Sequence, residues 1–442
     1  MTDRQPPATA RATEAAACAR DVALIVNTYQ KPRHLALVLE SIAAQRGVDG
    51  RFEVIISDDG STDGTADLVR GFAATAAFPV RFTSNPHDGF RLARTRNAGA
   101  RLSASDSLLF LDGDCVLPRD HVAAYLERRR PGRALLGYCA RLDEATSGRL
   151  TPESIATTDL AALANPAERR LLARRFRKAW WHTLLRHPSK PRLAGGNCGV
   201  WRQDYERVNG ADERFVGWGQ EDDDLGLRLR AAGVRLESIL DRTWSLHVWH
   251  PVDTSATPRW RDGVNVPYFL RRGRLTACRR GLVERPATSI VWGLPADAAD
   301  TPLGRGLLAH LADAPQAAAG EPCEVEIVVR PGRARFERRA ECRLLLLDGP
   351  VPVEPAVRRR ADQVRSVTDR EGPMAAVTSP GRHPANDGDG RATPPATLLA
   401  TQTTVSATQT TVSATQTTVS ATQTTVSATQ CAVLAAVLAD CG

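Results

Sequence analysis

The chain has 442 residues, enough for two or three domains, and its apolar fraction of 42% is ample for one good core. Its formal charge of +8 suits an anionic partner, but the chain lacks a motif of interleaved aromatic and basic residues, so we do not predict nucleic-acid binding. The nine cysteines are scattered without a C-x-x-C pair, which argues against a zinc site or a disulfide framework.

The same features predict a compartment. Scattered cysteines favour a reducing environment, residues 1–20 contain no apolar h-region, and no run approaches the ~20 apolar residues of a membrane span. We therefore predict a disordered tail over residues 1–20 and a cytoplasmic protein, with peripheral contact at the inner face of the membrane as an option.

Strands and helices alternate over the first 112 residues. Apolar runs predict buried strands at residues 21–27, 52–57, 79–83 and 108–112, and apolar residues at helical spacing predict helices after Pro32, around Leu68 and over residues 92–102. This alternation predicts an α/β fold, with a mainly parallel sheet and helices on both of its faces.

Polar side chains follow three of these strands. They are Thr28 and Tyr29 after the first strand, Asp58 and Asp59 after the second, and Asp112 and Asp114 after the fourth. Because ligands of such sheets bind outside the carboxyl ends of the strands, we expect these side chains to converge on one crevice. Carboxylates there can hold a hard divalent cation, which can hold a diphosphate. The sequence therefore predicts a nucleotide and metal site.

Residues 134–138 predict one more strand and residues 145–190 a largely helical region. Within it, Leu172, Phe176, Trp180 and Leu184 repeat every four residues, and arginines and lysines crowd the other faces of residues 167–190. Such a basic amphipathic helix can lie on an anionic membrane or contact a lipid-linked substrate. The alternative is an ordinary surface helix whose apolar stripe packs on the core.

Three further segments carry polar chemistry. Residues 195–199 form a glycine-rich loop that suits the close approach of a ligand, although a structural turn explains it equally. Residues 217–224 place a tryptophan between glycines, ahead of acids that the dipole of the following helix would stabilise. His247 and His250 then lie three apart among aromatic residues, where they could be structural or could ligate a metal.

Taken together, these segments resemble the family 2 glycosyltransferases of the GT-A nucleotide-diphospho-sugar transferase fold. The second half is similar to the C-terminal segment of β-1,4-galactosyltransferases and chondroitin-type polymerases. The matching segments, in the family's order, are residues 26–29, 57–63, 94–99, 112–114, 195–197 and 217–224. We therefore predict a glycosyltransferase domain over residues 21–285, with a nucleotide-sugar-binding half at 21–130 and an acceptor and catalytic half at 131–285.

The resemblance implies a role for each matching residue. Residues on the donor side would be Thr28, Tyr29, Asp58, Asp59, Arg94, Asn97 and Asp112. Asp112 and Asp114 match the DxD motif that binds Mn²⁺ or Mg²⁺, with His250, or alternatively His247, completing the metal shell. The acceptor side would consist of Gly195, Gly196, Asn197 and Trp218. The catalytic base would be Asp222 or Glu221, of which we prefer Asp222.

The resemblance also implies a reaction. A divalent cation stabilises the charge on the departing nucleoside diphosphate, and a carboxylate takes the proton of the acceptor hydroxyl. We expect an inverting transferase that uses a nucleotide-sugar, in particular a UDP-sugar, and a glycan or lipid-linked acceptor in cell-surface polysaccharide synthesis. The alternative is a non-catalytic scaffold on a degenerate transferase fold, against which the intact acids argue.

The resemblance ends near residue 285. Residues 286–349 form an appended region in which 324–330 and 342–347 could make a β-hairpin or a small subdomain. Residues 350–395 are rich in Pro, Arg, Ala and Gly and are predicted to be a linker. From residue 400 the heptapeptide Ala-Thr-Gln-Thr-Thr-Val-Ser repeats four times, with too few apolar residues for a stable coiled coil, so we predict a low-complexity tail.

Overall fold

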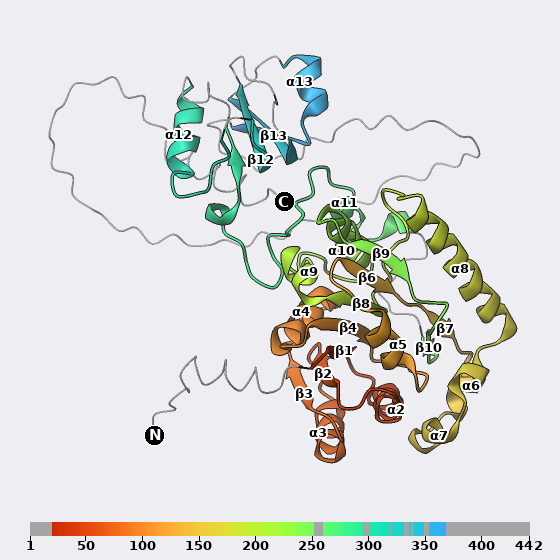
Figure 1. Ribbon diagram of the computed structural model, residues 1–442. Helices are drawn as coiled ribbons and strands as arrows, with labels where there is room; N and C mark the ends of the chain where they lie inside the picture. The colour runs from red at the N-terminus through yellow and green to blue at the C-terminus, as the bar shows by residue number, and fades with distance from the viewer. Residues whose placement is uncertain are drawn as a thin grey trace, which may run out of the picture.

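The computed structural model describes residues 20–251, 260–294, 301–318, 320–330, 336, 339–348 and 353–367. Its centre is a seven-stranded sheet in the order β3-β2-β1-β4-β8-β6-β9 (Figure 1). The strands are β1 (Val22–Thr28), β2 (Phe52–Asp58), β3 (Val80–Ser84), β4 (Ser107–Asp112), β6 (Arg133–Leu136), β8 (Asn197–Trp201) and β9 (Arg235–Ser238). Only β8 runs against its neighbours in this sheet, so the mainly parallel sheet predicted above is confirmed.

Both faces of the sheet are covered, because successive residues of each apolar strand point to opposite sides. Val22, Leu24 and Val26 of β1 belong to one core, and Ala23 and Ile25 belong to the other. The first core includes side chains of α2 (Pro32–Ala43), α3 (Thr65–Thr75) and α5 (His121–Arg128), and the second includes side chains of α4 (Leu92–Leu102), α9 (Arg202–Arg207) and α10 (Glu221–Ala231). Helices therefore lie on both faces, as predicted.

A second, smaller sheet lies beside the end of β4. It has the order β5-β10-β7 and consists of β5 (Cys115–Val116), β10 (Ser245–His247) and β7 (Cys139–Arg141). In it, His247 pairs with Cys115, the residue that follows Asp114. This pairing brings the histidine segment to the acidic end of β4.

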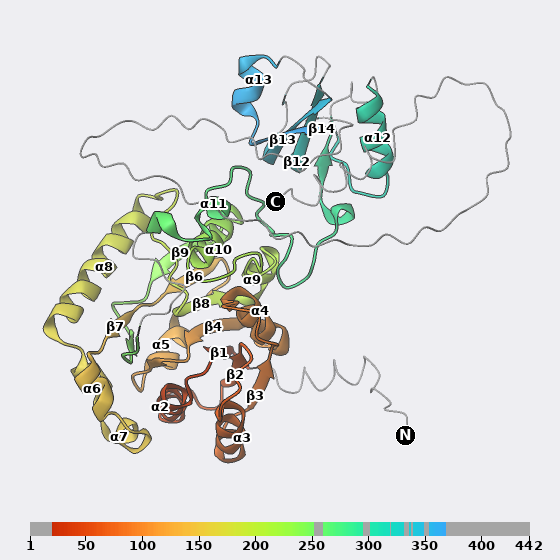
Figure 2. The same ribbon diagram turned by 180° about the vertical axis from the view of Figure 1, so that it is seen from behind.

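The region 145–190 is helical, as predicted. It contains α6 (Glu144–Arg149), α7 (Pro152–Thr157), the 3-10 turn η1 (Leu160–Leu163) and the long α8 (Pro166–Leu184). Figure 2 shows α8 along the outer edge of the molecule, beside β7 and β9. The expectation that its apolar stripe packs on the core is only half right: Leu172 is buried, but Trp180 and Leu184 are exposed.

Residues 290–367 contain a third sheet, in the order β11-β12-β13-β14. Its strands are β11 (Trp292–Gly293), β12 (Cys323–Arg330), β13 (Ala340–Asp348) and β14 (Gln363–Val367), and its helices are α12 (Pro302–His310) and α13 (Pro355–Arg360). All three pairings are parallel, so a hairpin of β12 and β13 is wrong. The linker predicted from residue 350 is also wrong over 353–367, because α13 and β14 complete the sheet.

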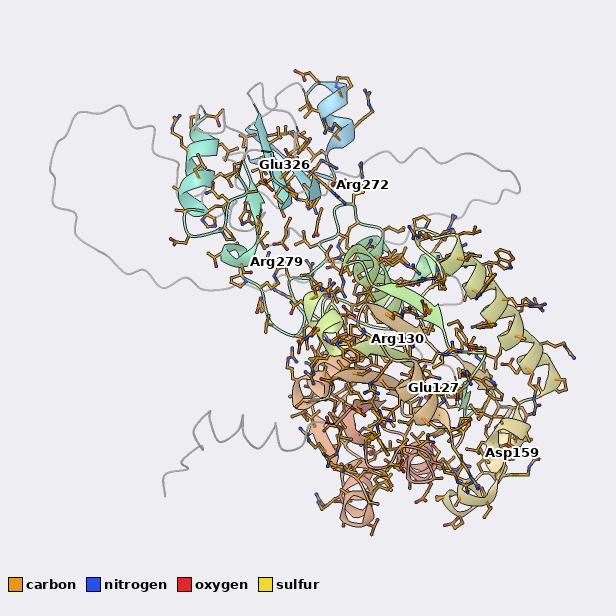
Figure 3. The ribbon with its side chains drawn as sticks, in the orientation of Figure 1. Glu127, Arg130, Asp159, Arg272, Arg279 and Glu326 are labelled. Carbon is orange, nitrogen blue, oxygen red and sulfur yellow. The ribbon has the colours of Figure 1, made fainter. Side chains whose placement is uncertain are left out.

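The apolar runs explain why this sheet is parallel, since β12 and β13 are buried between two cores, one contacting α12 and the other α13. An ion pair between Arg272 and Asp362, 3.5 Å long, joins it to the chain that follows α11 (Val266–Phe269); Figure 3 marks Arg272. Two 3-10 turns, η2 (Trp260–Asp262) and η3 (Ala287–Ser289), complete the described elements. The predicted tails at residues 1–19 and 368–442, including the repeats, lie outside the described residues.

Candidate active site

The ends of β1, β2 and β4 lie side by side, as predicted. In the parallel register Thr28 pairs with Asp58, and Asn27 pairs with Asp112. The turn after β4 is held against β1 because the Gly113 N–H donates to the Asn27 carbonyl at 2.7 Å. The three polar strand ends therefore form one edge of the sheet, at which the remaining site residues gather.

The two acids after β2 have different surroundings. The Asp58 carboxylate accepts hydrogen bonds from the N–H groups of Gly60 and Ser61 and from the hydroxyls of Ser61 and Ser84, between 2.6 and 3.1 Å. These bonds fix the turn and occupy both oxygens, so the structure gives Asp58 a structural position rather than a donor contact. Asp59 is also buried, but an arginine lies beside it: its Oδ2 accepts the Arg91 N–H at 3.1 Å, its Oδ1 lies 3.7 Å from the Arg94 guanidinium, and burial raises its pKa.

Aromatic rings line the donor side. Tyr29 is partly exposed and stacks on the ring of His87, with centroids 4.2 Å apart and planes 7° from parallel. His87 in turn contacts the Asp59 carbonyl oxygen at 2.9 Å through Nδ1. Thr28 is buried beneath them, and its hydroxyl has no hydrogen-bond partner among the described residues. The structure thus brings Thr28, Tyr29, Asp59 and Arg94 to one side of the crevice.

Asn97 does not reach the crevice, which corrects its predicted role. Its side chain is fully buried, and its Nδ2 donates to the Ala211 carbonyl at 2.8 Å and to Glu213 at 2.9 Å. Its Oδ1 accepts from the Tyr205 hydroxyl at 2.7 Å and from the Ala211 N–H at 3.0 Å. Asn97 therefore fastens α4 to the segment after α9.

The predicted metal ligands were Asp112, Asp114 and either His250 or His247, and the structure brings Asp114 and both histidines together. The His250 Nε2 lies 3.1 Å from Asp114 Oδ2, and the His247 Nε2 lies 3.6 Å from Asp114 Oδ1. One ligand atom of each lies within 4.8 Å of the others, which is a plausible separation for a shared cation. Because both rings face the same carboxylate, either His247 or His250, or both, could be the metal ligand.

The orientation of the His250 ring suits a metal ligand. Its Nδ1 lies 2.6 Å from the Pro251 carbonyl, and because a carbonyl only accepts hydrogen bonds, Nδ1 must carry the proton. This leaves Nε2 toward Asp114, the arrangement by which a second-shell carbonyl orients a metal-binding imidazole. The Asp114 hydrogen bond raises the pKa of His250, whereas burial lowers that of His247.

A lysine already occupies a cation position at this site. The Lys31 Nζ lies 3.1 Å from Asp114 Oδ2, the same oxygen that faces His250. Burial opposes the charge of Asp114, but His250, His247 and Lys31 together hold its pKa well below the usual range. Burial and the charge of Asp114 instead raise the pKa of Asp112 to about 7. The ionised Asp114 therefore already attracts positive charge, and a metal ion bound there would compete with Lys31 for it.

The candidate base is paired with a buried arginine. The Arg96 guanidinium, fully enclosed, forms an ion pair with Asp222 Oδ1, and the Gly195 N–H donates to Asp222 Oδ2 at 2.8 Å. Among the described residues no partner is found for Arg96 Nε and Nη2. Glu221 is more deeply buried, and burial together with the charge of Asp222 raises its pKa to about 8.

The two glycines of the predicted acceptor loop are needed because neither position has room for a side chain. A Cβ added at Gly195 would collide with Asp222 and Arg96, and one added at Gly196 would collide with Asp112. Consecutive glycines thus let Asp112 and Asp222 pack beside each other on one backbone segment. Asn197, the third predicted acceptor residue, is instead buried, and its Oδ1 contacts the ring of His121 at 3.1 Å and accepts from Tyr125 at 2.9 Å.

Trp218 lies on the loop that leads into α10. Gly217 and Gly219 have φ angles of 79° and 104°, which favour glycine, and Trp218 between them is 48% exposed. The amide of Asn265 holds the loop, because its Nδ2 donates to the Gly219 carbonyl at 2.9 Å and its Oδ1 accepts from the Val216 N–H at 3.2 Å. The tryptophan is therefore presented to solvent by a braced loop.

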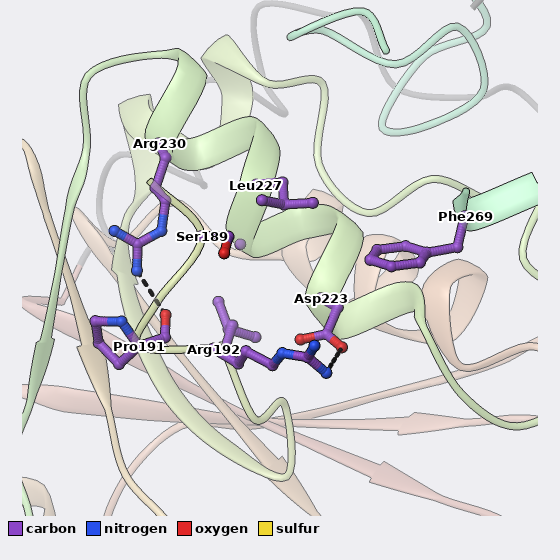
Figure 4. Close-up of a pocket in the computed structure, with 9 residues that line it drawn as sticks. Ser189, Pro191, Arg192, Asp223, Leu227, Arg230 and Phe269 are labelled. Carbon is purple, nitrogen blue, oxygen red and sulfur yellow. Dashed lines mark hydrogen bonds and ion pairs between the residues drawn. The ribbon is translucent and has the colours of Figure 1, made fainter. Parts of the chain in front are cut away.

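The segment before Gly195 is fastened to α10. Figure 4 shows the small pocket between them, where Arg230 donates to the Pro191 carbonyl at 2.5 Å and Arg192 pairs with Asp223 at 3.1 Å. Asp223 thus pairs with Arg192, whereas its neighbour Asp222 pairs with Arg96. These contacts fix the approach to the glycine pair.

Sequence reasoning missed Arg96 and Lys31. Arg96 carried a detectable signal: together with Ala93, Asn97 and Ala100 it falls on the i, i+3, i+4, i+7 face of α4, which is the buried face. An arginine on such a face requires a buried acid. Lys31 had no comparable pattern, because it precedes α2 and reaches Asp114 only through the fold.

Family models match most of the region just described. Residues 23–168 match the model described as glycosyl transferase family 2, and residues 182–248 match the model described as the N-terminal domain of galactosyltransferase. Residues 23–168 and 182–248 therefore match glycosyltransferase family models, in agreement with the resemblance predicted from the sequence.

Individual relatives are more distant. Validoxylamine A glucosyltransferase of Streptomyces hygroscopicus subsp. limoneus is 29% identical over 246 residues, 52% of each chain, and chondroitin synthase of Escherichia coli is 24% identical over 273 residues, 57% of this chain and 39% of the synthase. The chain thus spans about half the length of the first relative. Among solved structures, mannosyltransferase PcManGT from Pyrobaculum calidifontis, in complex with GDP-Man and Mn²⁺, aligns with 50% of this chain and 55% of its own chain. The sequence identity is 19% and the TM-score is 0.36.

Proposed function

We propose that the chain is an inverting, divalent-metal-dependent glycosyltransferase that moves a sugar from a nucleotide-diphospho-sugar, in particular a UDP-sugar, to a glycan or glycolipid acceptor in cell-surface polysaccharide synthesis. One observation carries the proposal: the DxD acid Asp112 and the arginine-paired acid Asp222 pack on two consecutive glycines. A cation-attracting cluster and a candidate base thereby share one crevice. The names of the matched glucosyltransferase and chondroitin synthase support the same class of reaction.

The residues present fit a divalent cation. Asp114, His247 and His250 would hold it, with Asp112 beside them, and a mixed set of carboxylate and imidazole ligands suits Mn²⁺. The Lys31 ammonium on Asp114 supports this fit, because the position already accepts positive charge. When bound, the cation would neutralise charge on the departing nucleoside diphosphate. Lys31 would withdraw from Asp114 toward the diphosphate.

Asp222 is the preferred base in this proposal. Its side chain is 26% exposed, whereas Glu221 is almost enclosed and has a raised pKa that favours its protonated form at neutral pH. Arg96 and the Gly195 N–H fix the carboxylate, which would accept the proton of the acceptor hydroxyl as it attacks the sugar. One base and one displacement give inversion at the sugar carbon.

Turnover tests the proposal. The full chain, supplied with Mn²⁺ and a panel of UDP- and GDP-sugars, should release nucleoside diphosphate, and both Asp114→Ala and Asp222→Asn should reduce release by at least ~100-fold. Asp223→Asn is the matched control: it removes the charge of the neighbouring carboxylate, which pairs with Arg192 and not with Arg96, and should keep most of the activity.

Two outcomes would count against the enzyme. Turnover like that of the unmodified chain in both Asp114→Ala and Asp222→Asn would refute the assignment of the site. Binding of a nucleotide-sugar without hydrolysis or transfer to any acceptor would instead favour the non-catalytic scaffold.

A further inference from the structure

Large apolar side chains are exposed at the C-terminal end of α8. Trp180, Trp181, Leu184 and Leu185 are 49%, 55%, 51% and 72% exposed, and we call this group the tryptophan edge. The rings of Trp180 and Trp181 meet edge to face, with centroids 4.9 Å apart. Single exposed apolar residues are ordinary on a protein surface, but four large ones within six positions form a patch.

The inner side of α8 is fastened, so the helix does not roll to bury this patch. Leu172 and Ala179 are buried, and the Arg175 guanidinium lies 3.6 Å from the centroid of the Tyr138 ring. One residue before the end of the helix, the Thr183 hydroxyl donates to the Leu236 carbonyl at 3.0 Å. The tryptophan edge is therefore a fixed feature of the outer face.

Strong positive charge surrounds the patch. Residues 166–192 contain nine lysines and arginines and a single acid, Glu168, whose carboxylate accepts the Arg141 N–H at 3.0 Å. On the exposed face of α8, Arg170, Arg174, Arg177 and Lys178 precede the tryptophan edge. In Figures 1 and 2 this helix lies along the outer edge of the molecule, where nothing else in the described chain covers it.

We infer that α8 is a docking surface for an anionic phospholipid bilayer, with the tryptophan edge inserted at the headgroup level and the arginines and lysines on the lipid phosphates. Tryptophan and leucine beside basic residues are the composition of helices that lie in the membrane interface. No helix in the part of the chain that the structure describes is long and apolar enough to cross a bilayer.

Charge complementarity selects this occupant over a second copy of the chain. Two copies of α8 face to face would oppose six positively charged residues with six, which costs free energy, whereas an anionic surface attracts them. A bilayer also accommodates the indole rings, whose apolar body and N–H suit the boundary between acyl chains and water.

The test is partition of the full chain onto vesicles. Sedimentation with phosphatidylcholine vesicles, with and without phosphatidylglycerol, should show binding that requires the anionic lipid and weakens as salt rises from ~0.1 to ~1 M, because the Debye length falls from about 10 to about 3 Å. The double variant R174E/R177E should lower the partition coefficient by about thirtyfold or more, and W181A/L185A by about tenfold.

Matched controls lie elsewhere on the surface. R70E/R280E reverses two exposed arginines far from α8, and V264A/V283A trims two exposed apolar side chains, so both should bind vesicles like the unmodified chain. Far-UV circular dichroism and thermal melting should show that all four variants are folded. Because none of them touches the crevice, the assay is independent of transferase activity.

Three results would overturn the inference. One is the absence of binding to anionic vesicles. Another is equal binding by the α8 variants and the controls, which would locate the lipid-binding surface elsewhere. The third is a dimer, measured by light scattering without lipid, that W181A/L185A dissociates, since a second copy would then cover the tryptophan edge.

Discussion

Replacing Gly195 by alanine should damage the candidate site while leaving the fold intact. An added Cβ would lie about 1 Å nearer to Asp222 Oδ1 than the 3.0 Å that real Cβ atoms keep, and it would also press on the buried Arg96 guanidinium. Arg96 is enclosed and cannot retreat, so Asp222 must move by roughly 1 Å. A misplacement of about 1 Å can cost ~100-fold in rate.

We therefore expect Gly195→Ala to lower kcat by about 100-fold, with a smaller change in the KM for the donor. The assay is nucleoside diphosphate release with the donor that the panel identifies. Gly71→Ala is the matched control, because an added Cβ there meets nothing within 4 Å in the described chain and Gly71 lies inside α3. That variant should keep full activity and gain up to about 1 kcal/mol of stability.

The reasoning fails if folded Gly195→Ala retains kcat within about twofold of the unmodified chain. Such a result would mean that the position of Asp222 against Gly195 does not matter for turnover. A drop in kcat of equal size in Gly71→Ala would also refute it, since the effect would then not come from the crevice.

Three further predictions concern metal, stability and pH. Chelation with EDTA should abolish turnover, and added Mn²⁺ should restore it. His250→Ala should raise the Mn²⁺ concentration for half-maximal turnover more than about tenfold. An unchanged Mn²⁺ dependence would exclude His250 as a ligand. Arg228→Met removes the buried guanidinium that pairs with Asp224 Oδ2 at 2.7 Å and leaves this carboxylate only Arg271 and Arg274, so it should lower the free energy of unfolding by about 3 kcal/mol in urea denaturation. Arg280→Met, at an exposed pair, should change it by less than about 0.5 kcal/mol. Burial lowers the pKa of His121 to about 4 from 6.5, so the unfolded chain binds more protons than the folded chain between these pH values. The free energy of unfolding should therefore decrease as the pH is lowered from 6.5 to 4, by up to about 1.4 kcal/mol per pH unit. Denaturation of His121→Gln across this range should show a shallower slope, and parallel curves would contradict the assignment.

Much of the fold was predictable because it rests on local patterns. The runs at residues 21–27, 52–57 and 108–112 are mostly apolar, which is characteristic of strands buried on both faces, and they form β1, β2 and β4. Acids placed directly after two of those runs had to meet at one edge once the strands paired in parallel. The appended sheet was less predictable, because pairing direction depends on the crossover between β12 and β13.

Site residues were predictable only as far as their neighbours in sequence explained them. The sequence could not show that Asp58 and Asp59 have different hydrogen-bond partners. The Asp58 carboxylate accepts a hydrogen bond from Ser84, which lies on another strand. Asn97 and Asn197 matched family motifs, yet both are buried in hydrogen bonds that hold elements together. An amide is equally suited to either use, and only its surroundings distinguish them.

The sequence by itself determined which residues end the parallel strands, where the glycines lie, and that two histidines follow an acidic helix. Tertiary structure decided which of these groups face one another: Arg96 reaches Asp222 across 126 positions, and Lys31 reaches Asp114 across 83. The physical reason is one of range. Hydrophobic periodicity reports the face that each segment turns toward the core, whereas a buried charge reports only that some partner exists. Which partner it is depends on how separate segments pack, and that packing places Asp112 and Asp222 on two consecutive glycines.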